Sequence, residues 1–180
     1  KENAYFLSRG EITGDIGVKK SVADYPVEEL IVNDRVTVNG NAIGDSVRVG
    51  SRATVTGDVV YNEATIDSSA NIGGQITPLS LPVPDPFSQF PAFEAGSEDV
   101  RIGNGESLQL PSGIYGNIRL VGRNPNEPAT LQLQGGTYSI ESLSLLGMNS
   151  RVECLAPCEL RIKGYLVTGM STYLGGAEGS

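Results

Sequence analysis

Small and β-branched residues alternate with polar ones over two or three positions along much of the chain. Val36-Thr37-Val38 and Ala53-Thr54-Val55 show this pattern, and Asn39 and Gly57 follow them within two positions. Alternation with a period of two predicts short β-strands with one buried face, and glycine, asparagine and aspartate favour the turns between them. No segment shows sustained helical periodicity. We therefore expect an all-β fold.

A repeat of 17 residues runs through the first half of the chain. Val36–Gly40, Ala53–Gly57 and Ala70–Gly74 align at this spacing. Such a repeat predicts stacked coils, each with three short strands and three corners, about 4.8 Å apart. Equivalent positions then form ladders, and one interior ladder is expected from Val38, Val55 and Ile72.

The second half of the chain repeats at a different spacing. Leu108–Tyr115 is echoed 23 residues later by Leu131–Tyr138, and Leu120 aligns with Leu143 at the same offset. Arg123–Pro128 is rich in asparagine and proline, which predicts a loop that lengthens this coil. We expect coils with longer loops in this half.

Together the repeats predict a right-handed parallel β-helix, or β-solenoid, with coils of roughly 17 residues. Residues 1–76 are expected to form regular coils, residues 77–98 an extended proline-rich crossover, and residues 99–180 irregular coils. A central strand cannot accommodate the five prolines of the crossover, and its many apolar residues favour docking on the solenoid flank over a flexible linker. A left-handed helix with six-residue steps is the alternative, but 17 residues do not complete three such steps.

Composition and charge exclude several classes of function. The 180 residues include 13 Lys+Arg and 21 Asp+Glu, for a net charge of −8. This acidic balance disfavours binding to nucleic acid and to anionic membranes. The chain has no histidine, which excludes Ser-His-Asp catalysis and histidine-ligated zinc.

The chain offers no segment for insertion into a bilayer. No apolar run approaches the roughly 18–20 residues that span a membrane, and no signal-peptide core is present. The sequence starts at Lys1 rather than at a methionine. We expect it to be part of a longer protein.

Two stretches resemble known bacterial families. Val47–Val59 (VRVGSRATVTGDV) looks like the coils of bactofilins, which are polymer-forming β-helical proteins. The region from Leu110 through Gly135–Tyr138 to Cys158 is similar to the β-helical ectodomains of PilX-like and TadG-like surface and pilus-associated proteins. Their proline-rich crossover resembles Leu81–Phe87. Both resemblances imply a structural or polymer-forming role without a cofactor.

Cys154-Leu155-Ala156-Pro157-Cys158 is the sharpest local motif. In a secreted chain it closes a small disulfide loop, whereas a reducing cytoplasm would leave two unlinked thiols. We expect the Cys154–Cys158 disulfide and an extracellular or cell-surface location. A cytoplasmic, cytoskeletal location is the alternative.

Carboxylates are the remaining candidates for catalysis, because β-helix folds host polysaccharide hydrolases and lyases that use clustered acids. Two groups stand out: Asp15, Asp45 and Asp58 beside turn glycines, and Glu94, Glu98 and Asp99 near the end of the crossover. None forms a recognisable pair, and hydrogen bonding in turns explains these acids better. We expect no catalytic residue, no cofactor and no metal site.

Tyrosines are the candidates for stacking on sugars, namely Tyr61, Tyr115, Tyr138, Tyr165 and Tyr173. The alternative is that these side chains cap coil edges and corners with a hydrated hydroxyl.

Neither chain end shows a segment that would cap a solenoid. An open end presents unpaired backbone groups and apolar side chains, and it stacks on another molecule unless it is capped. We expect self-association through five residues near the termini: Tyr5, Phe6, Leu7, Tyr173 and Leu174.

The sequence thus predicts a non-catalytic structural subunit of a bacterial cell-surface or filamentous assembly. Its partners are expected to be further copies of itself or other surface and pilus proteins. A carbohydrate-binding or adhesive module that binds glycans is one alternative, and a polysaccharide-cleaving enzyme is another.

Overall fold

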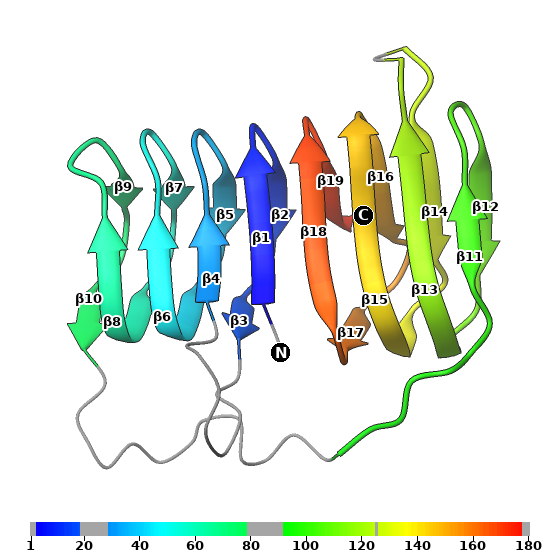
Figure 1. Ribbon diagram of the computed structural model, residues 1–180, viewed down its shortest axis with the longest axis horizontal. Helices are drawn as coiled ribbons and strands as arrows, with labels where there is room; N and C mark the ends of the chain where they lie inside the picture. Colours follow the sequence, from blue (N-terminus) through cyan, green and yellow to red (C-terminus); the bar gives the residue numbers. More distant parts are fainter. Residues whose placement is uncertain (1–2, 19–28, 79–91, 125, 178–180) are drawn as a thin grey trace.

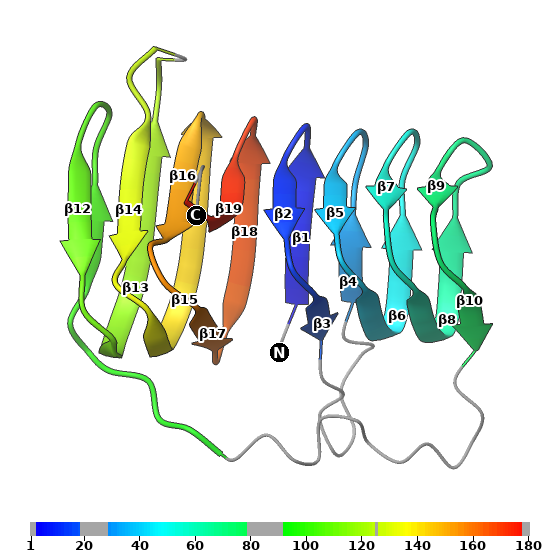
Figure 2. The same ribbon diagram turned by 180° about the vertical axis from the view of Figure 1, so that it is seen from behind.

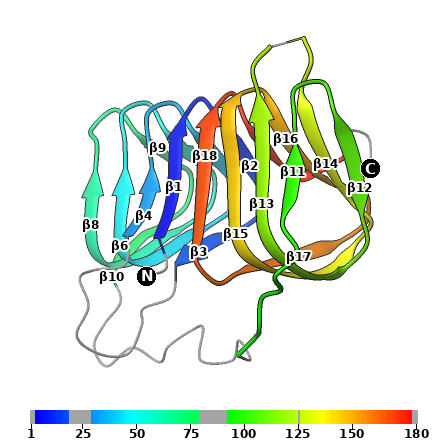
Figure 3. The same ribbon diagram turned by 45° about the vertical axis from the view of Figure 1, so that its right-hand side comes forward.

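The computed structural model describes residues 3–18, 29–78, 92–124 and 126–177 (Figure 1). These residues form β-strands and contain no α-helix, which confirms the expected all-β class. Within the described ranges, no helix could therefore cross a membrane. The strands form two parallel sheets that face each other (Figure 3). Most of the predicted crossover, residues 79–91, lies outside the described residues.

The larger sheet, which we call the front sheet, has nine strands side by side. In spatial order they are β10 (Ile76–Pro78), β8 (Val59–Ile66), β6 (Ala42–Val49), β4 (Glu29–Val32), β1 (Asn3–Ser8), β18 (Tyr165–Met170), β15 (Gly136–Met148), β13 (Gly113–Gly122) and β11 (Val100–Ile102). Two further strands pair with the beginnings of longer ones: β3 (Ile16–Val18) with β6, and β17 (Cys158–Ile162) with β15.

The smaller sheet, the back sheet, is seen in Figure 2. Its order is β12 (Ser107–Leu110), β14 (Ala129–Leu133), β16 (Ser150–Cys154), β19 (Tyr173–Gly176), β2 (Glu11–Thr13), β5 (Thr37–Asn39), β7 (Thr54–Val55) and β9 (Asn71–Ile72). Along the chain, a strand of the front sheet is followed by one of the back sheet, and we call each such pair a tier.

The chain starts in the middle of the row of tiers rather than at one end. The N-half, β1 to β10, leads outward from the middle, and the C-half, β11 to β19, starts at the opposite end and leads back (Figure 1). The halves meet where β1 pairs with β18, with Tyr5 opposite Val167, and where β2 pairs with β19, with Ile12 opposite Leu174. The first and last described strands, β1 and β19, consequently both lie at the junction.

The 17-residue repeat sets the register of the N-half. Val38 pairs with Val55 and Val55 with Ile72, so the expected interior ladder is confirmed. The buried aliphatic residues form one cluster in each half, and Leu166 and Leu174 pack against both clusters. Burial of aliphatic side chains along such ladders is the main stabilising contribution to the fold.

The register of the C-half differs between the two sheets. Leu108 pairs with Leu131 in the back sheet, as the 23-residue repeat predicts. In the front sheet Leu120 pairs with Leu145, so its predicted match with Leu143 is wrong. The corner that leads into β15 is longer by two residues, and Gly135 and Gly136 adopt positive φ there (105° and 88°). The added length shifts the following strand by two positions.

The corners between front and back strands also depart from the expected turn chemistry. A residue other than glycine has positive φ at five of them; Asn149 fits the expected chemistry, whereas Arg9, Arg35, Arg52 and Ser171 do not. Side chains other than those of asparagine and aspartate rarely adopt this conformation. Backbone bonds to the neighbouring tier hold it, since the Arg35 N–H donates to the Ser51 carbonyl oxygen at 3.0 Å.

Phe6 provides a test of the junction between the halves. Its side chain is 1% exposed, whereas the neighbouring Leu7 on the same strand is 45% exposed. We expect Phe6→Ala to lower the free energy of unfolding by about 3–5 kcal/mol, because it leaves a cavity beside β18. Leu7→Ala is the matched control, with a change within about 0.5 kcal/mol. Urea denaturation measures both, and similar losses would contradict the assigned facing of β1.

Candidate functional site

The residues expected to mediate self-association lie at the junction of the two halves. Tyr5, Phe6 and Leu7 belong to β1, which pairs with both β4 and β18. Tyr173 and Leu174 belong to β19, which pairs with both β16 and β2. The first and last described strands therefore lie in the middle of the row, and other strands form its ends.

One end of the row consists of β8, β9 and β10, and the other consists of β11 and β12. Ile76 at the first end is 48% exposed, although Val59, its partner one tier inward, is fully buried. Leu108 at the second end is 38% exposed, although its inward partner Leu131 is 1% exposed. Among the described residues, no strand pairs with the outer edges of these ends. Each end thus presents aliphatic residues that a further tier would bury.

The acids beside turn glycines form a hydrogen-bonded series along one corner of the N-half. Asp15 Oδ1 accepts hydrogen bonds from the backbone N–H and the side-chain amide of Asn41, at 2.8 and 2.9 Å. Asn41 Oδ1 then accepts from the Asp58 N–H, and Asp58 Oδ1 from the Gln75 N–H, both at 2.8 Å. These side chains connect consecutive tiers, which gives Asp15 and Asp58 a structural role.

Asp45 and Asp99, two of the other candidate acids, also have structural partners. Asp45 accepts a hydrogen bond from the Asn62 side-chain amide. Asp99 Oδ1 accepts from the Asn117 N–H at 2.7 Å, and this bond connects the start of β11 to β13. Within the described ranges, no three His, Cys, Asp or Glu side chains lie close enough together to hold a metal ion.

The cysteine motif forms the disulfide that the sequence predicts. Cys154 ends β16 and Cys158 begins β17, with their Cα atoms 5.9 Å apart. The bond closes a loop whose Leu155 is 38% exposed. It ties the back sheet to the strand that leads toward β18.

Tyr115 and Tyr138 lie inside the C-half, where they cannot serve as sugar-stacking surfaces. They are 8% and 0% exposed, and their rings stack with centroids 6.3 Å apart. Each hydroxyl donates to a backbone carbonyl oxygen, that of Pro111 at 2.8 Å and that of Leu110 at 3.0 Å. Burial raises the pKa of Tyr115, and the nearby Tyr138 and Glu98 raise it further.

The other candidate tyrosines differ in exposure and do not form one platform. Tyr165 is 46% exposed on β18. Tyr173 on β19 packs under the Arg151 guanidinium, whose central carbon lies 5.1 Å from the ring centroid. Tyr61 packs against the core of the N-half. The sugar-stacking alternative therefore has no cluster of aromatic faces among the described residues.

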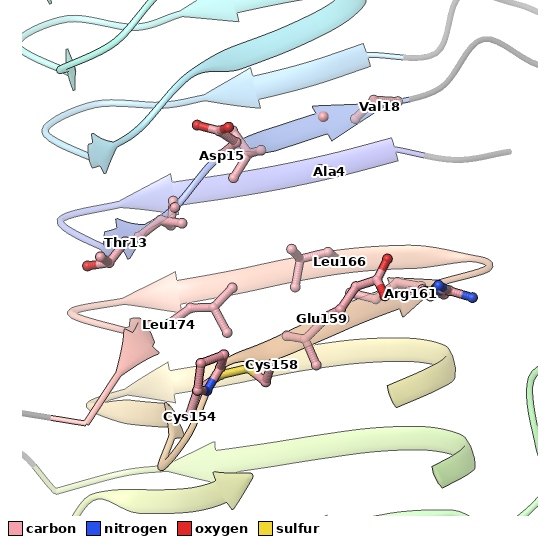
Figure 4. Close-up of a pocket in the computed structure, with 18 of the residues that line it drawn as sticks. Ala4, Thr13, Asp15, Val18, Cys154, Cys158, Glu159, Arg161, Leu166 and Leu174 are labelled. Carbon is pink, nitrogen blue, oxygen red and sulfur yellow. Dashed lines mark hydrogen bonds and ion pairs between the residues drawn. A yellow bond between two sulfur atoms is a disulfide. The ribbon is translucent and has the colours of Figure 1, made fainter. Parts of the chain in front are cut away.

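A groove of about 1290 Å³ opens at the junction of the halves, and we call it the junction groove (Figure 4). Residues of β3 line one side of it, and β17 with the disulfide loop lines the other. Phe6, Ile12, Leu166 and Leu174 from the four paired junction strands contribute apolar side chains. Sequence reasoning did not find this groove, because its sides come from segments about 140 residues apart in the chain.

Comparison of the chain with protein-family models, with curated proteins and with solved structures finds no match. No family is assigned. The resemblances to bactofilins and to PilX-like and TadG-like ectodomains thus remain predictions from the sequence.

The raised pKa of Tyr115 predicts a loss of stability at alkaline pH. A tyrosine with a higher pKa in the folded state favours folding while it is neutral, and this contribution disappears as the pH rises through the folded pKa. We expect the free energy of unfolding to fall as the pH rises above about 10, the ordinary pKa of tyrosine, and to fall less steeply for Tyr115→Phe. Tyr165→Phe is the exposed control and should follow the wild type. Parallel curves for all three proteins, from urea denaturation at each pH, would refute this coupling.

Removal of the disulfide tests its contribution to stability. Because the closed loop is short, we expect the double substitution Cys154→Ser and Cys158→Ser to lower the free energy of unfolding by only about 2 kcal/mol. Reduction of the wild type should give a similar loss in thermal or urea denaturation, and the double variant should not respond to the reductant. A reductant response in the double variant would show that the effect has another origin.

Proposed function

We propose that the chain is a right-handed parallel β-solenoid that acts as a non-catalytic structural subunit of a bacterial cell-surface or filamentous assembly. In Figure 1 the front strands run upward and successive tiers of both halves advance toward the left, and in Figure 2 the back strands run downward. A coil that rises in front, descends behind and advances to the left is right-handed. This sense supports the handedness in the proposal.

The observation that carries the proposal is the open, aliphatic character of both end tiers. Ile76 is about half exposed and Leu108 about two-fifths exposed. The residues that pair with them one tier inward, Val59 and Leu131, are buried. All strands of a sheet run in the same direction, so β11 and β12 of one copy have the polarity needed to extend the β8–β10 end of another. This contact joins two different surfaces, and such head-to-tail contacts build open chains of subunits.

Two further observations favour an extracellular structural role. A disulfide persists in an oxidising compartment and is rare in a reducing one, which favours the cell surface over the cytoplasm. The Asp15 and Asp58 carboxylates accept hydrogen bonds from backbone N–H groups of the neighbouring tier, so both acids have a structural role. Both observations favour a structural subunit, and its proposed partners are further copies of itself or other surface proteins.

Electron microscopy and light scattering over a range of concentrations test this function. We expect the wild type to form filaments, and Ile76→Asp and Leu108→Asp each to require at least about tenfold higher concentration, because each buries a charge at the contact. Met170→Asp is the matched control, since Met170 is 49% exposed but lies on β18 in the middle of the row. It should assemble like the wild type.

Mixing the two end variants distinguishes head-to-tail contacts from contacts between like ends. Each variant retains one intact end, so the mixture should form dimers that grow no further. If either variant dimerises alone to the same extent, like ends associate and the head-to-tail arrangement is wrong. If the wild type stays monomeric at every concentration, the assembly function itself is wrong.

A further inference from the structure

We propose that three arginines in consecutive turns of the N-half, Arg9, Arg35 and Arg52, bind an acidic linear polysaccharide that runs across the tiers. We call these three residues the arginine ladder. The inference rests on their register, their backbone conformation and their charge. The site lies on tiers inward of the β8–β10 end, so it adds a binding activity to the proposed structural role and does not depend on it.

The arginines occupy equivalent positions in three neighbouring turns. Arg9 lies between β1 and β2, Arg35 between β4 and β5, and Arg52 between β6 and β7. These turns lie side by side above the front strands in Figure 1. The Arg9 N–H donates to the Asp34 carbonyl oxygen at 3.2 Å, and the Arg35 N–H donates to that of Ser51 at 3.0 Å. Each arginine is thus bonded to the residue before the next one, and their backbones are one tier apart, about 4.8 Å.

The backbone conformation of these turns does not favour arginine. The φ angles of Arg9, Arg35 and Arg52 are 50°, 55° and 55°. Arg35 is the third residue of a four-residue turn, which the Val36 N–H closes by donating to the Asn33 carbonyl oxygen at 3.3 Å. Such a turn with positive φ at its third residue favours glycine or asparagine there. Residues held in this conformation cluster at ligand-binding sites, and three successive arginines therefore point to a use of the side chain.

The charges of the arginine ladder are largely uncompensated. All three residues are exposed, and like charges in adjacent tiers repel one another. Arg35 Nε lies 3.6 Å from an Asp34 carboxylate oxygen, with both side chains about two-fifths exposed, and an ion pair so hydrated contributes little. Among the described residues, no carboxylate pairs with Arg9 or Arg52. A chain of net charge −8 thus carries a short positive stripe, whose repulsion an anionic partner would relieve.

The spacing and chemistry of the arginine ladder fit a polymer with one carboxylate per unit. A guanidinium group presents a planar fork of donors that matches the two oxygens of a carboxylate. In a linear chain of uronic acids every sugar carries one carboxylate, and each sugar advances the chain by a length close to the spacing of the tiers. Long arginine side chains can reach carboxylates on either side of such a chain. One polysaccharide laid across the turns would therefore meet the three arginines in succession.

Nucleic acid fits the arginine ladder less well than an acidic polysaccharide. Sites for single strands combine positive charge with aromatic side chains on which the bases stack. The three turns, residues 7–10, 33–36 and 50–53, contain no aromatic residue. The net charge of −8 also repels a long phosphate backbone. The Cys154–Cys158 disulfide favours an oxidising, extracellular compartment, in which acidic polysaccharides occur.

Fluorescence anisotropy of a labelled polygalacturonate oligomer tests the proposal, with the protein at low salt and below its assembly concentration. We expect the triple variant Arg9→Gly, Arg35→Gly and Arg52→Gly to bind at least about tenfold more weakly than the wild type. Because glycine adopts positive φ without strain, the urea midpoint of this variant should equal or exceed that of the wild type. Neutral dextran should not bind, and added salt should weaken the binding of polygalacturonate.

A second triple variant removes the same charge from the other half. Arg101→Ser, Arg119→Ser and Arg123→Ser replace three exposed arginines of the C-half, and binding should stay unchanged. An equal loss in both triple variants would show that only the overall charge matters and would overturn the proposal. A lower urea midpoint of the glycine variant would overturn it too, because the arginines would then serve the fold.

The class of partner is tested with the same two variants. No binding of polygalacturonate at about 1 mM, or equally tight binding of single-stranded DNA or poly-glutamate through the arginine ladder, would show that the assigned partner is wrong. The glycine variant should still form filaments, since the end tiers are intact. Failure of the assembly proposal and failure of this one are therefore distinguishable.

Discussion

The parallel pairing of β1 with β18 and of β2 with β19 is the constraint on which the rest of the structure depends. It joins segments from the two termini, and Leu166 and Leu174 continue the apolar interior across it. Without this pairing the molecule would be two short rows of tiers with four exposed ends. With it, only the β8–β10 and β11–β12 ends stay open among the described strands, and β1 and β19 lie in the middle.

The junction joins the two halves through both sheets, and among the described residues a groove lies beside it. The front and back sheets continue through it, while β3 and β17 face each other across the junction groove. One topological feature thus leaves two kinds of surface: end tiers with exposed aliphatic residues, and the junction groove. The Cys154–Cys158 disulfide fixes the start of β17 at its side.

Polar residues connect the tiers where aliphatic ladders cannot reach. Asp15, Asn41 and Asp58 each accept a hydrogen bond from the backbone of the next tier. Such bonds satisfy N–H groups that a corner would otherwise leave without an acceptor. They also hold the tiers in register, because each side chain reaches only the equivalent position of its neighbour. The acids that suggested chemistry in the sequence are thus part of the scaffold.

The sequence by itself determined the local strands, the 17-residue register of the N-half and the disulfide. Alternation and repeat length act between neighbours, so Val38, Val55 and Ile72 predict their own ladder. Only the tertiary structure decided that Phe6 is buried, that Leu174 pairs with Ile12 at the junction, and that Leu120 pairs with Leu145. A repeat specifies how one coil stacks on the next but not which coils are terminal, because that depends on a pairing between residues more than 150 positions apart.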